Sequence, residues 1–148
     1  MLTDASMRQI LIVDDESLIC NVVADTFHDM PDHEVSIALD GDEGARKLRQ
    51  THYDLVVLDA LLPKISGMAL ADIAAAKDIP VLMISGHPDM NEKLEKFGFP
   101  YLPKPFSIAQ LMTEAGYVIS HSEENIRRVK ASAARLKAGR TGKEGLLF

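Results

Sequence analysis

The chain has 148 residues, 47% hydrophobic and 26% charged, which fits one compact domain and a short tail. Its single cysteine, Cys20, excludes an internal disulfide framework, and no apolar run approaches the roughly 20 residues that a membrane-spanning helix needs. The first residues lack the charged-then-apolar pattern of a secretory signal. We therefore expect a cytoplasmic protein with no membrane partner.

The net charge of −6 is unevenly distributed. Residues 1–120 carry nineteen acidic and nine basic side chains, whereas residues 121–148 carry three acidic and seven basic ones. An acidic body argues against direct nucleic-acid binding by that part of the chain, because the phosphate backbone would repel it. The basic tail could contact phosphate groups, but its charges are equally typical of the solvated face of a helix.

Short apolar runs alternate with helical patterns along the chain. The runs predict five strands, at 9–13, 34–38, 55–58, 81–84 and 101–102. The helices expected after them cover 17–29, 42–50, 67–76, 89–97 and 107–119. Continuous apolar strands that alternate with helices predict an α/β fold, with a parallel sheet covered on both faces.

Two of the expected helices carry more specific signals. The first places Leu18, Val22 and Phe27 on one broad apolar face, which we expect to be buried. The last opens with Ser107 and Gln110, spaced as a capping box.

Polar residues stand at the carboxyl ends of four strands. Asp14 and Asp15 follow the first strand, Asp59 the third, Ser85 the fourth and Lys104 the fifth. In an open doubly wound sheet, ligands bind beyond these ends, so the residues should converge on one crevice. Adjacent carboxylates at the edge of a core are costly unless a cation compensates them. Oxygen ligands of this kind suit a largely hydrated Mg²⁺, and no histidine and cysteine cluster points to zinc.

The ordered set of residues resembles the receiver domain of two-component response regulators. The resemblance is carried by the acidic pair Asp14-Asp15, by Asp59 followed by Leu62-Pro63 and Gly67, by Ser85 with a small residue after it, and by the run YLPKPF at 101–106. It covers about residues 8–120 and leaves 121–148 as a basic helical or flexible tail. It implies a flavodoxin-like, five-stranded parallel sheet in the order 2-1-3-4-5, flanked by helices.

The resemblance implies a phosphoacceptor and its metal site. Asp59 would take a phosphoryl group from the phosphohistidine of a histidine kinase or a phosphotransfer protein. Asp15, Asp59 and the backbone carbonyl of Leu61 would hold Mg²⁺, while Asp14 would act through water or orient the other ligands. The metal would neutralise charge during the transfer.

The resemblance also implies a switch. Lys104 would pair with one phosphoryl oxygen, and Ser85 would donate a hydrogen bond to another. Tyr101 would turn inward once Ser85 is drawn toward the phosphoryl group. A downstream protein would read the surface formed by the fourth helix, the fifth strand and the fifth helix. A cis bond between Lys104 and Pro105 would aim the lysine at the site.

Several single residues lie outside this scheme. Leu61 and His87 depart from many relatives at two positions that flank the path of an attacking water, so they bear on the phosphoryl lifetime. Cys20 is expected in the core as a small apolar residue. The remaining histidines are expected at the surface: His28, His33, His52 and His121.

Two other functions stay open at this point. A pseudo-receiver would bind partners without being phosphorylated, and it would not need the five strand-end residues together. A Mg²⁺-dependent phosphohydrolase with an aspartyl-phosphate intermediate would need a second acid/base aspartate where this chain has Leu61. We therefore expect a phosphorelay switch, not an enzyme beyond self-phosphorylation and slow autodephosphorylation. The short tail leaves no room for an output domain, so direct control of transcription is not expected.

The tail continues an apolar pattern from the last helix. Residues at heptad spacing predict one long helix that helps form a homodimer, together with the face of the fourth and fifth helices: Met112, Ala115, Ile119, Ser122, Ile126, Val129, Ala133 and Leu136. Two alternatives are a tail folded onto its own domain and a disordered tail. A helix of this length is marginal alone in water, so the apolar stripe needs a partner.

Overall fold

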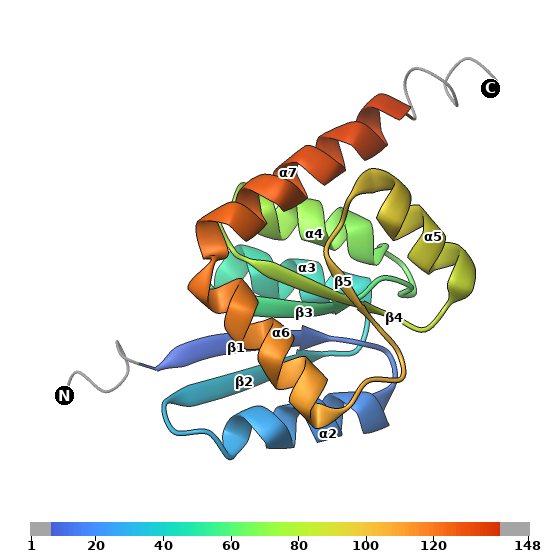
Figure 1. Ribbon diagram of the computed structural model, residues 1–148. Coiled ribbons are helices and arrows are strands. Elements are labelled where there is room, and N and C mark those ends of the chain that lie inside the picture. The colour runs from blue at the N-terminus through green and yellow to red at the C-terminus, as the bar shows by residue number, and fades with distance from the viewer. Residues whose placement is uncertain (1–6, 140–148) are drawn as a thin grey trace.

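Five parallel strands form one sheet in a computed structural model that describes residues 7–139. They are β1 (Arg8–Val13), β2 (His33–Ala38), β3 (Leu55–Asp59), β4 (Val81–Ser85) and β5 (Tyr101–Pro103). Their order across the sheet is β2-β1-β3-β4-β5 (Figure 1). This confirms the expected doubly wound fold and its strand order.

Residues 7–139 form six helices, which pack around the sheet. They are α2 (Ser17–His28), α3 (Gly41–Gln50), α4 (Gly67–Ala76), α5 (Pro88–Phe97), α6 (Ile108–Ser120) and α7 (Ser122–Gly139). Five of them lie close to the ranges expected from the sequence, and α7 occupies most of the tail. Within residues 7–139, no helix is long and apolar enough to cross a membrane.

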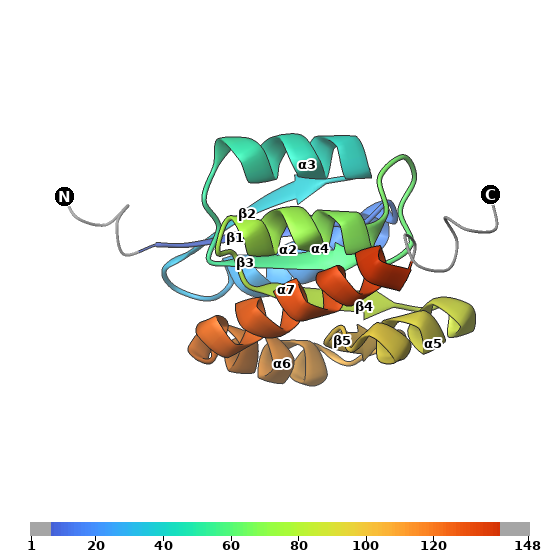
Figure 2. The ribbon, with the colours of Figure 1, turned by 90° about the horizontal axis from the view of Figure 1, so that it is seen from above.

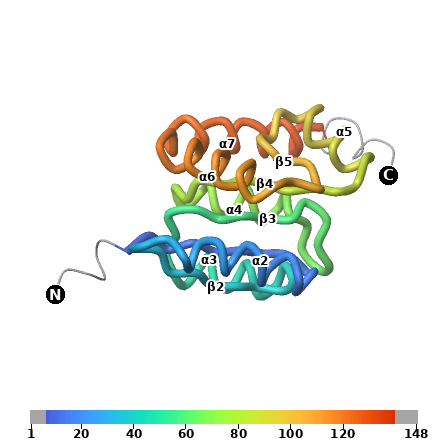
Figure 3. Tube along the Cα trace, turned by 60° about the horizontal axis from the view of Figure 1, so that its bottom comes forward, coloured from blue at the N-terminus to red at the C-terminus, as the bar shows by residue number. Residues whose placement is uncertain are grey.

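Alternate residues of each buried strand point to opposite faces of the sheet and feed two separate cores. Ile10 and Ile12 of β1 pack with α2 and α6, whereas Leu11 and Val13 pack with α3, α4 and α7. Figure 2 shows α3 and α4 on one side of the sheet and α6 on the other, and Figure 3 looks onto the sheet, with β2 near one edge and β5 near the other. Because both faces are covered, the central strands β3 and β4 are buried at every position, and apolar side chains fill all of them except the polar residue that ends each strand.

The buried face of α2 differs from the one we expected. Phe27 is buried as predicted, but the exposed fractions of Leu18 and Val22 are 75% and 46%. The residues of α2 that are buried are Cys20, Val23, Ala24 and Phe27, which repeat at helical spacing on a different side. The helix is apolar on more than one side, so periodicity alone did not identify the side that meets the sheet.

Several local expectations are confirmed. Ser107 and Gln110 form a capping box at the start of α6. The Lys104–Pro105 peptide bond is cis. Cys20 is buried, and His28, His52 and His121 are exposed. His33 is half-buried and stacks on the ring of Phe27.

The expected continuous helix is interrupted at His121, which ends α6, and α7 begins at Ser122. Val129, Ala133 and Leu136 of α7 are buried in the core that α4 also enters. The dimer seam predicted through α7 is therefore wrong, because its own domain covers these side chains. The packing is possible because α4 presents the small residues Ala71, Ala74 and Ala75, which let the two helices approach closely. Residues 140–148 lie outside the described part of the chain.

A buried asparagine of α7 forms two hydrogen bonds with the backbone of the sheet. The Asn125 Oδ1 accepts a hydrogen bond from the Val81 N–H at 2.7 Å, and the Asn125 Nδ2 donates one to the Val81 carbonyl at 2.8 Å. The side-chain amide thus replaces a neighbouring strand at the first residue of β4. β5 pairs only with Met83, Ile84 and Ser85, so it does not reach Val81.

Replacing this asparagine should destabilise the whole domain. In Asn125→Ala, the buried N–H and C=O of Val81 lose their partners, and we expect the free energy of unfolding to fall by about 2–4 kcal/mol. Urea unfolding followed by far-ultraviolet circular dichroism measures the change. Glu124→Ala, at the exposed neighbouring position, is the control and should change stability by less than about 0.5 kcal/mol. Equal losses in the two variants would contradict the assigned role of Asn125.

Candidate functional site

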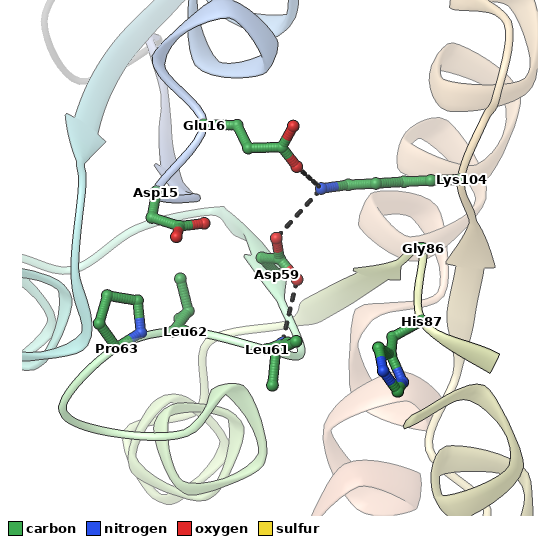
Figure 4. Close-up of a pocket in the computed structure, with 9 residues that line it drawn as sticks. All are labelled: Asp15, Glu16, Asp59, Leu61, Leu62, Pro63, Gly86, His87 and Lys104. Atoms are coloured by element: carbon green, nitrogen blue, oxygen red, sulfur yellow. Dashed lines mark hydrogen bonds and ion pairs between the residues drawn. The ribbon is translucent and has the colours of Figure 1, made fainter. Parts of the chain in front are cut away.

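The carboxyl ends of the strands border an open cleft of about 580 Å³. Figure 4 shows its lining residues, which come from β1, β3, β4 and β5 and the segments after them: Asp15, Glu16, Asp59, Leu61, Leu62, Pro63, Gly86, His87 and Lys104. Asp15, Asp59, Leu61 and Lys104 were expected here. Asp14 is fully buried next to Lys104, and Ser85 is buried at the end of β4.

Three carboxylates meet at the floor of this cleft. Asp14, Asp15 and Asp59 each offer one oxygen, and these three oxygens lie within 4.8 Å of one another. Two of these carboxylates also accept a hydrogen bond from the backbone: Asp14 Oδ1 accepts from the Glu16 N–H at 2.9 Å, and Asp59 Oδ1 accepts from the Leu61 N–H at 3.0 Å. The backbone two residues further on therefore fixes the orientation of each of these two carboxylates.

The ammonium group of Lys104 lies among the carboxylates. Its Nζ is 2.9 Å from Glu16 Oε1, 3.0 Å from Asp59 Oδ2 and 3.1 Å from Asp14 Oδ2. Burial alone would lower the pKa of Lys104, but its hydrogen bonds to Glu16, Asp59 and Asp14 raise that pKa above its ordinary value. Lys104 is therefore charged at neutral pH. The sequence analysis did not place Glu16 in the site, although the run DDE put it next to the acidic pair.

The buried carboxyl of Asp14 has an altered acidity. Burial raises the pKa of Asp14 to about 6, and the nearby charge of Asp59 adds to this rise. The hydrogen bond from the Glu16 backbone and the contact with Lys104 act in the opposite direction. The Cys20 thiol lies beside Asp14 and donates to the Asp14 carbonyl oxygen at 3.2 Å. Burial raises the pKa of that thiol to about 11, so it stays protonated at neutral pH.

The two residues expected to act as a switch lie apart from the lining of the cleft. Ser85 Oγ accepts a long hydrogen bond of 3.5 Å from the His87 N–H. Tyr101 is half-buried, and its hydroxyl donates to Glu95 Oε1 of α5 at 2.7 Å. This bond raises the pKa of the Tyr101 phenol. The tyrosine thus connects β5 with α5 in this arrangement.

Asp59 is largely buried, with an exposed fraction of 6%, but it lines the cleft. Leu61, with an exposed fraction of 54%, and His87 both line the cleft (Figure 4). Gly67 lies on the opposite side of the backbone, where a Cβ would collide with the carbonyl oxygen of Asp59. Only a glycine lets the start of α4 pack this closely against the end of β3.

A second, apolar groove of about 500 Å³ adjoins the cleft. Lys104 and Gly86 line both. The groove is otherwise formed by side chains of α2, of the segment before α6 and of the first residue of α6: Leu18, Ile19, Val22, Val23, Pro105, Phe106 and Ile108. This explains where the unexpected exposed face of α2 lies. The sequence of α2 already indicated this exposed face, because apolar residues lie on a second side of the helix.

Comparison with known proteins agrees with the resemblance to receiver domains that the strand-end residues suggested. The family described as the response regulator receiver domain matches residues 10–115. The chain is 46% identical to the uncharacterized transcriptional regulatory protein YcbL of Bacillus subtilis over 78 residues. This aligned stretch covers 50% of this chain and 34% of YcbL. The chain is 32% identical to the regulatory protein VanRB of Enterococcus faecalis over 136 residues. That aligned stretch covers 89% of this chain and 58% of VanRB.

Solved structures agree with this match. A CheY-like receiver domain protein from Methanospirillum hungatei superposes with a TM-score of 0.70 at 24% identity, over 80% of this chain and 98% of that one, and shows the common fold. The receiver domain of NtrX from Brucella abortus gives a TM-score of 0.66 at 30% identity, over 75% and 98% of the two chains. The chain spans about a third to somewhat over half of the curated relatives named above. On the family match and on these relatives, the chain belongs to the receiver domain family of two-component response regulators.

Proposed function

We propose that this chain is a phosphorelay switch that accepts a phosphoryl group on Asp59 in a Mg²⁺-dependent reaction. The observation that carries the proposal is the arrangement around Asp59: a carboxylate that lines the cleft, with two other carboxylates close by and an ammonium group 3.0 Å from its Oδ2. A nucleophilic carboxylate, a cation site and a charged lysine are the parts that phosphoryl transfer needs. The family to which the chain belongs supports the same conclusion.

The donor set fits Mg²⁺. Asp14, Asp15 and Asp59 supply hard carboxylate oxygens close together, and the open cleft leaves room for the waters that Mg²⁺ retains. Asp15, Asp59 and the backbone carbonyl of Leu61 would hold the ion, with Asp14 orienting the other ligands. When bound, the ion supplies positive charge that neutralises the transferring phosphoryl group.

The chemistry of the transfer follows from the groups in the cleft. An oxygen of the Asp59 carboxylate attacks the phosphorus of a phosphohistidine on a kinase or phosphotransfer protein, the P–N bond breaks, and the histidine leaves as the imidazole. Lys104, already close to Asp59, pairs with a phosphoryl oxygen of the product. Ser85 then donates to another phosphoryl oxygen and gives up its long bond with the His87 N–H.

The apolar groove beside the cleft is a suitable place for the phosphodonor protein. It lies next to Lys104 and is lined by exposed apolar side chains, so a donor seated there brings its phosphohistidine to the cleft. A different surface, formed by α5, β5 and α6, would be read by the downstream target once Tyr101 leaves Glu95. Leu61 and His87 flank Asp59, and the apolar Leu61 cannot orient an attacking water by hydrogen bonding, which favours a long-lived acyl phosphate.

Phosphorylation should depend on Asp59 alone. Incubating the chain with acetyl phosphate and Mg²⁺ should add one phosphoryl group, detected by intact mass. Asp59→Asn removes the nucleophile and should abolish the adduct, whereas Asp89→Asn, at an exposed aspartate of α5, should leave it unchanged. A full adduct on Asp59→Asn would refute the assignment. No adduct on the unchanged chain would favour a pseudo-receiver, and steady release of phosphate would favour a phosphohydrolase.

The affinity for Mg²⁺ should fall as the pH drops through about 6. Protonated Asp14 loses the charge that it contributes to the site, so proton and metal compete, and the pKa of Asp14 is raised to about 6. Isothermal titration with MgCl₂ should show a nearly constant affinity above about pH 7 and a decline of up to about tenfold per unit below pH 6.

Asp14→Asn is the matched control for this pH dependence. The amide cannot titrate, so this variant should bind Mg²⁺ more weakly at neutral pH but lose the decline between about pH 5 and 7. A decline of the unchanged chain that begins only near the ordinary carboxyl value of about 4 would contradict the role of Asp14.

A further inference from the structure

Two arginines of α7 bind the carboxyl end of α5. Arg135 donates to the Phe97 carbonyl oxygen from Nε at 3.1 Å and from Nη2 at 2.9 Å, and Arg128 Nε donates to the Gly98 carbonyl oxygen at 3.0 Å. The last carbonyls of a helix lack partners within the helix and carry partial negative charge. The guanidinium groups therefore complement this end of α5 and connect it to α7.

Apart from this connection and the Tyr101–Glu95 hydrogen bond, α5 has few contacts that hold it in place. Of its ten residues, only Leu94 is buried. Asn91 carries a buried Oδ1 that finds no hydrogen-bond partner among residues 7–139. A buried, unpaired amide oxygen disfavours the arrangement in which it lies. The present position of α5 thus depends on few contacts, and those with α7 are a substantial part of them.

The opposite end of α5 begins at the cleft. Gly86 and His87 line the cleft, and α5 starts at Pro88. The His87 N–H is bonded to Ser85 Oγ, and this bond is already long at 3.5 Å. When Ser85 turns toward a phosphoryl group on Asp59, this bond is lost, and the start of α5 is free to move. A short helix moves as a unit, so the movement reaches the carbonyls that α7 binds.

We propose that α7 is a clamp that holds α5 in the arrangement of the unmodified chain, so that docking of α7 and phosphorylation of Asp59 oppose each other. This inference rests on the proposed function. Coupling between two sites is reciprocal. If occupation of the phosphorylation site weakens the α7 contact by some factor, loss of the α7 contact must strengthen binding at that site by the same factor.

Two matched variants separate the clamp from simple electrostatics. Arg135→Ala removes a contact with α5, whereas Arg127→Ala removes the same charge from an arginine of α7 that has no hydrogen bond or ion pair within the described residues. Loss of a positive charge alone should weaken binding of an anionic probe. The clamp predicts the opposite for Arg135→Ala only. Arg128→Ala, which removes the other contact, repeats the comparison if Arg135→Ala does not fold.

The probe is beryllium fluoride with Mg²⁺, which imitates a phosphoryl group on a carboxylate. Its affinity for the full chain and for each variant is measured by titration with nuclear magnetic resonance detection. The same spectra give the hydrogen exchange of the Val81 amide. This N–H is bonded to Asn125 of α7 at 2.7 Å, so its exchange reports whether α7 is docked.

Three results would support the clamp. Arg135→Ala should bind the probe about fivefold more tightly than the unchanged chain, at the lower end of typical coupling. The Val81 amide should exchange faster in the unchanged chain when the probe is bound, and faster in Arg135→Ala without probe. Arg127→Ala should match the unchanged chain or bind more weakly.

Two results would overturn the clamp alone. These are equal probe affinities in the unchanged chain and Arg135→Ala, and Val81 exchange that does not respond to the probe. Failure of the unchanged chain to bind the probe at all would overturn the proposed function and the clamp together.

Discussion

The ammonium group of Lys104 among three carboxylates is the interaction on which the arrangement of the strand ends depends. Asp14, Glu16 and Asp59 come from the ends of β1 and β3, and all lie within 3.1 Å of this one cation. Without it, the carboxylates would repel one another at the edge of a dry sheet, where charges are poorly screened. The short β5 lies at the edge of the sheet, and the lysine that follows it reaches across to the ends of the central strands β1 and β3.

The single positive charge of Lys104 does not neutralise all the carboxylates at the strand ends. Three carboxylates contact a single lysine, and Asp15 lies close to two of them, so the site carries an excess of negative charge. The charge of Asp59 adds to the burial that raises the pKa of Asp14 to about 6. In the proposed function, a second cation would relieve this excess, and a transferred phosphoryl group would add negative charge again. The same excess, which costs stability in the unmodified domain, would then make the site responsive to Mg²⁺ and to phosphorylation. The two buried cores on either side of the sheet supply the stability that tolerates this local cost.

Sequence reasoning was most successful where the determining signal is local. Continuous apolar runs located the five strands, and the acids at their ends located the cleft, because parallel strands end at one edge whatever the rest of the chain does. It was wrong where the outcome depends on remote partners. Leu18 and Val22 fit a buried helical face, but the register of α2 on the sheet exposes them. The seam through Val129, Ala133 and Leu136 was correctly found to need a partner, yet the small side chains of α4, more than fifty residues earlier, provide it.

The side-chain amide of Asn125 has a consequence for how the molecule avoids its own copies. β5 covers three residues only, so the first part of β4 would otherwise present an unpaired N–H and C=O at an open sheet edge. Such edges recruit strands from other molecules and begin aggregation. Asn125 occupies both groups of Val81, and α7 lies over the place where a foreign strand would add. The C-terminal helix thus protects solubility as well as shape, and any partner that draws α7 away must cover this edge itself.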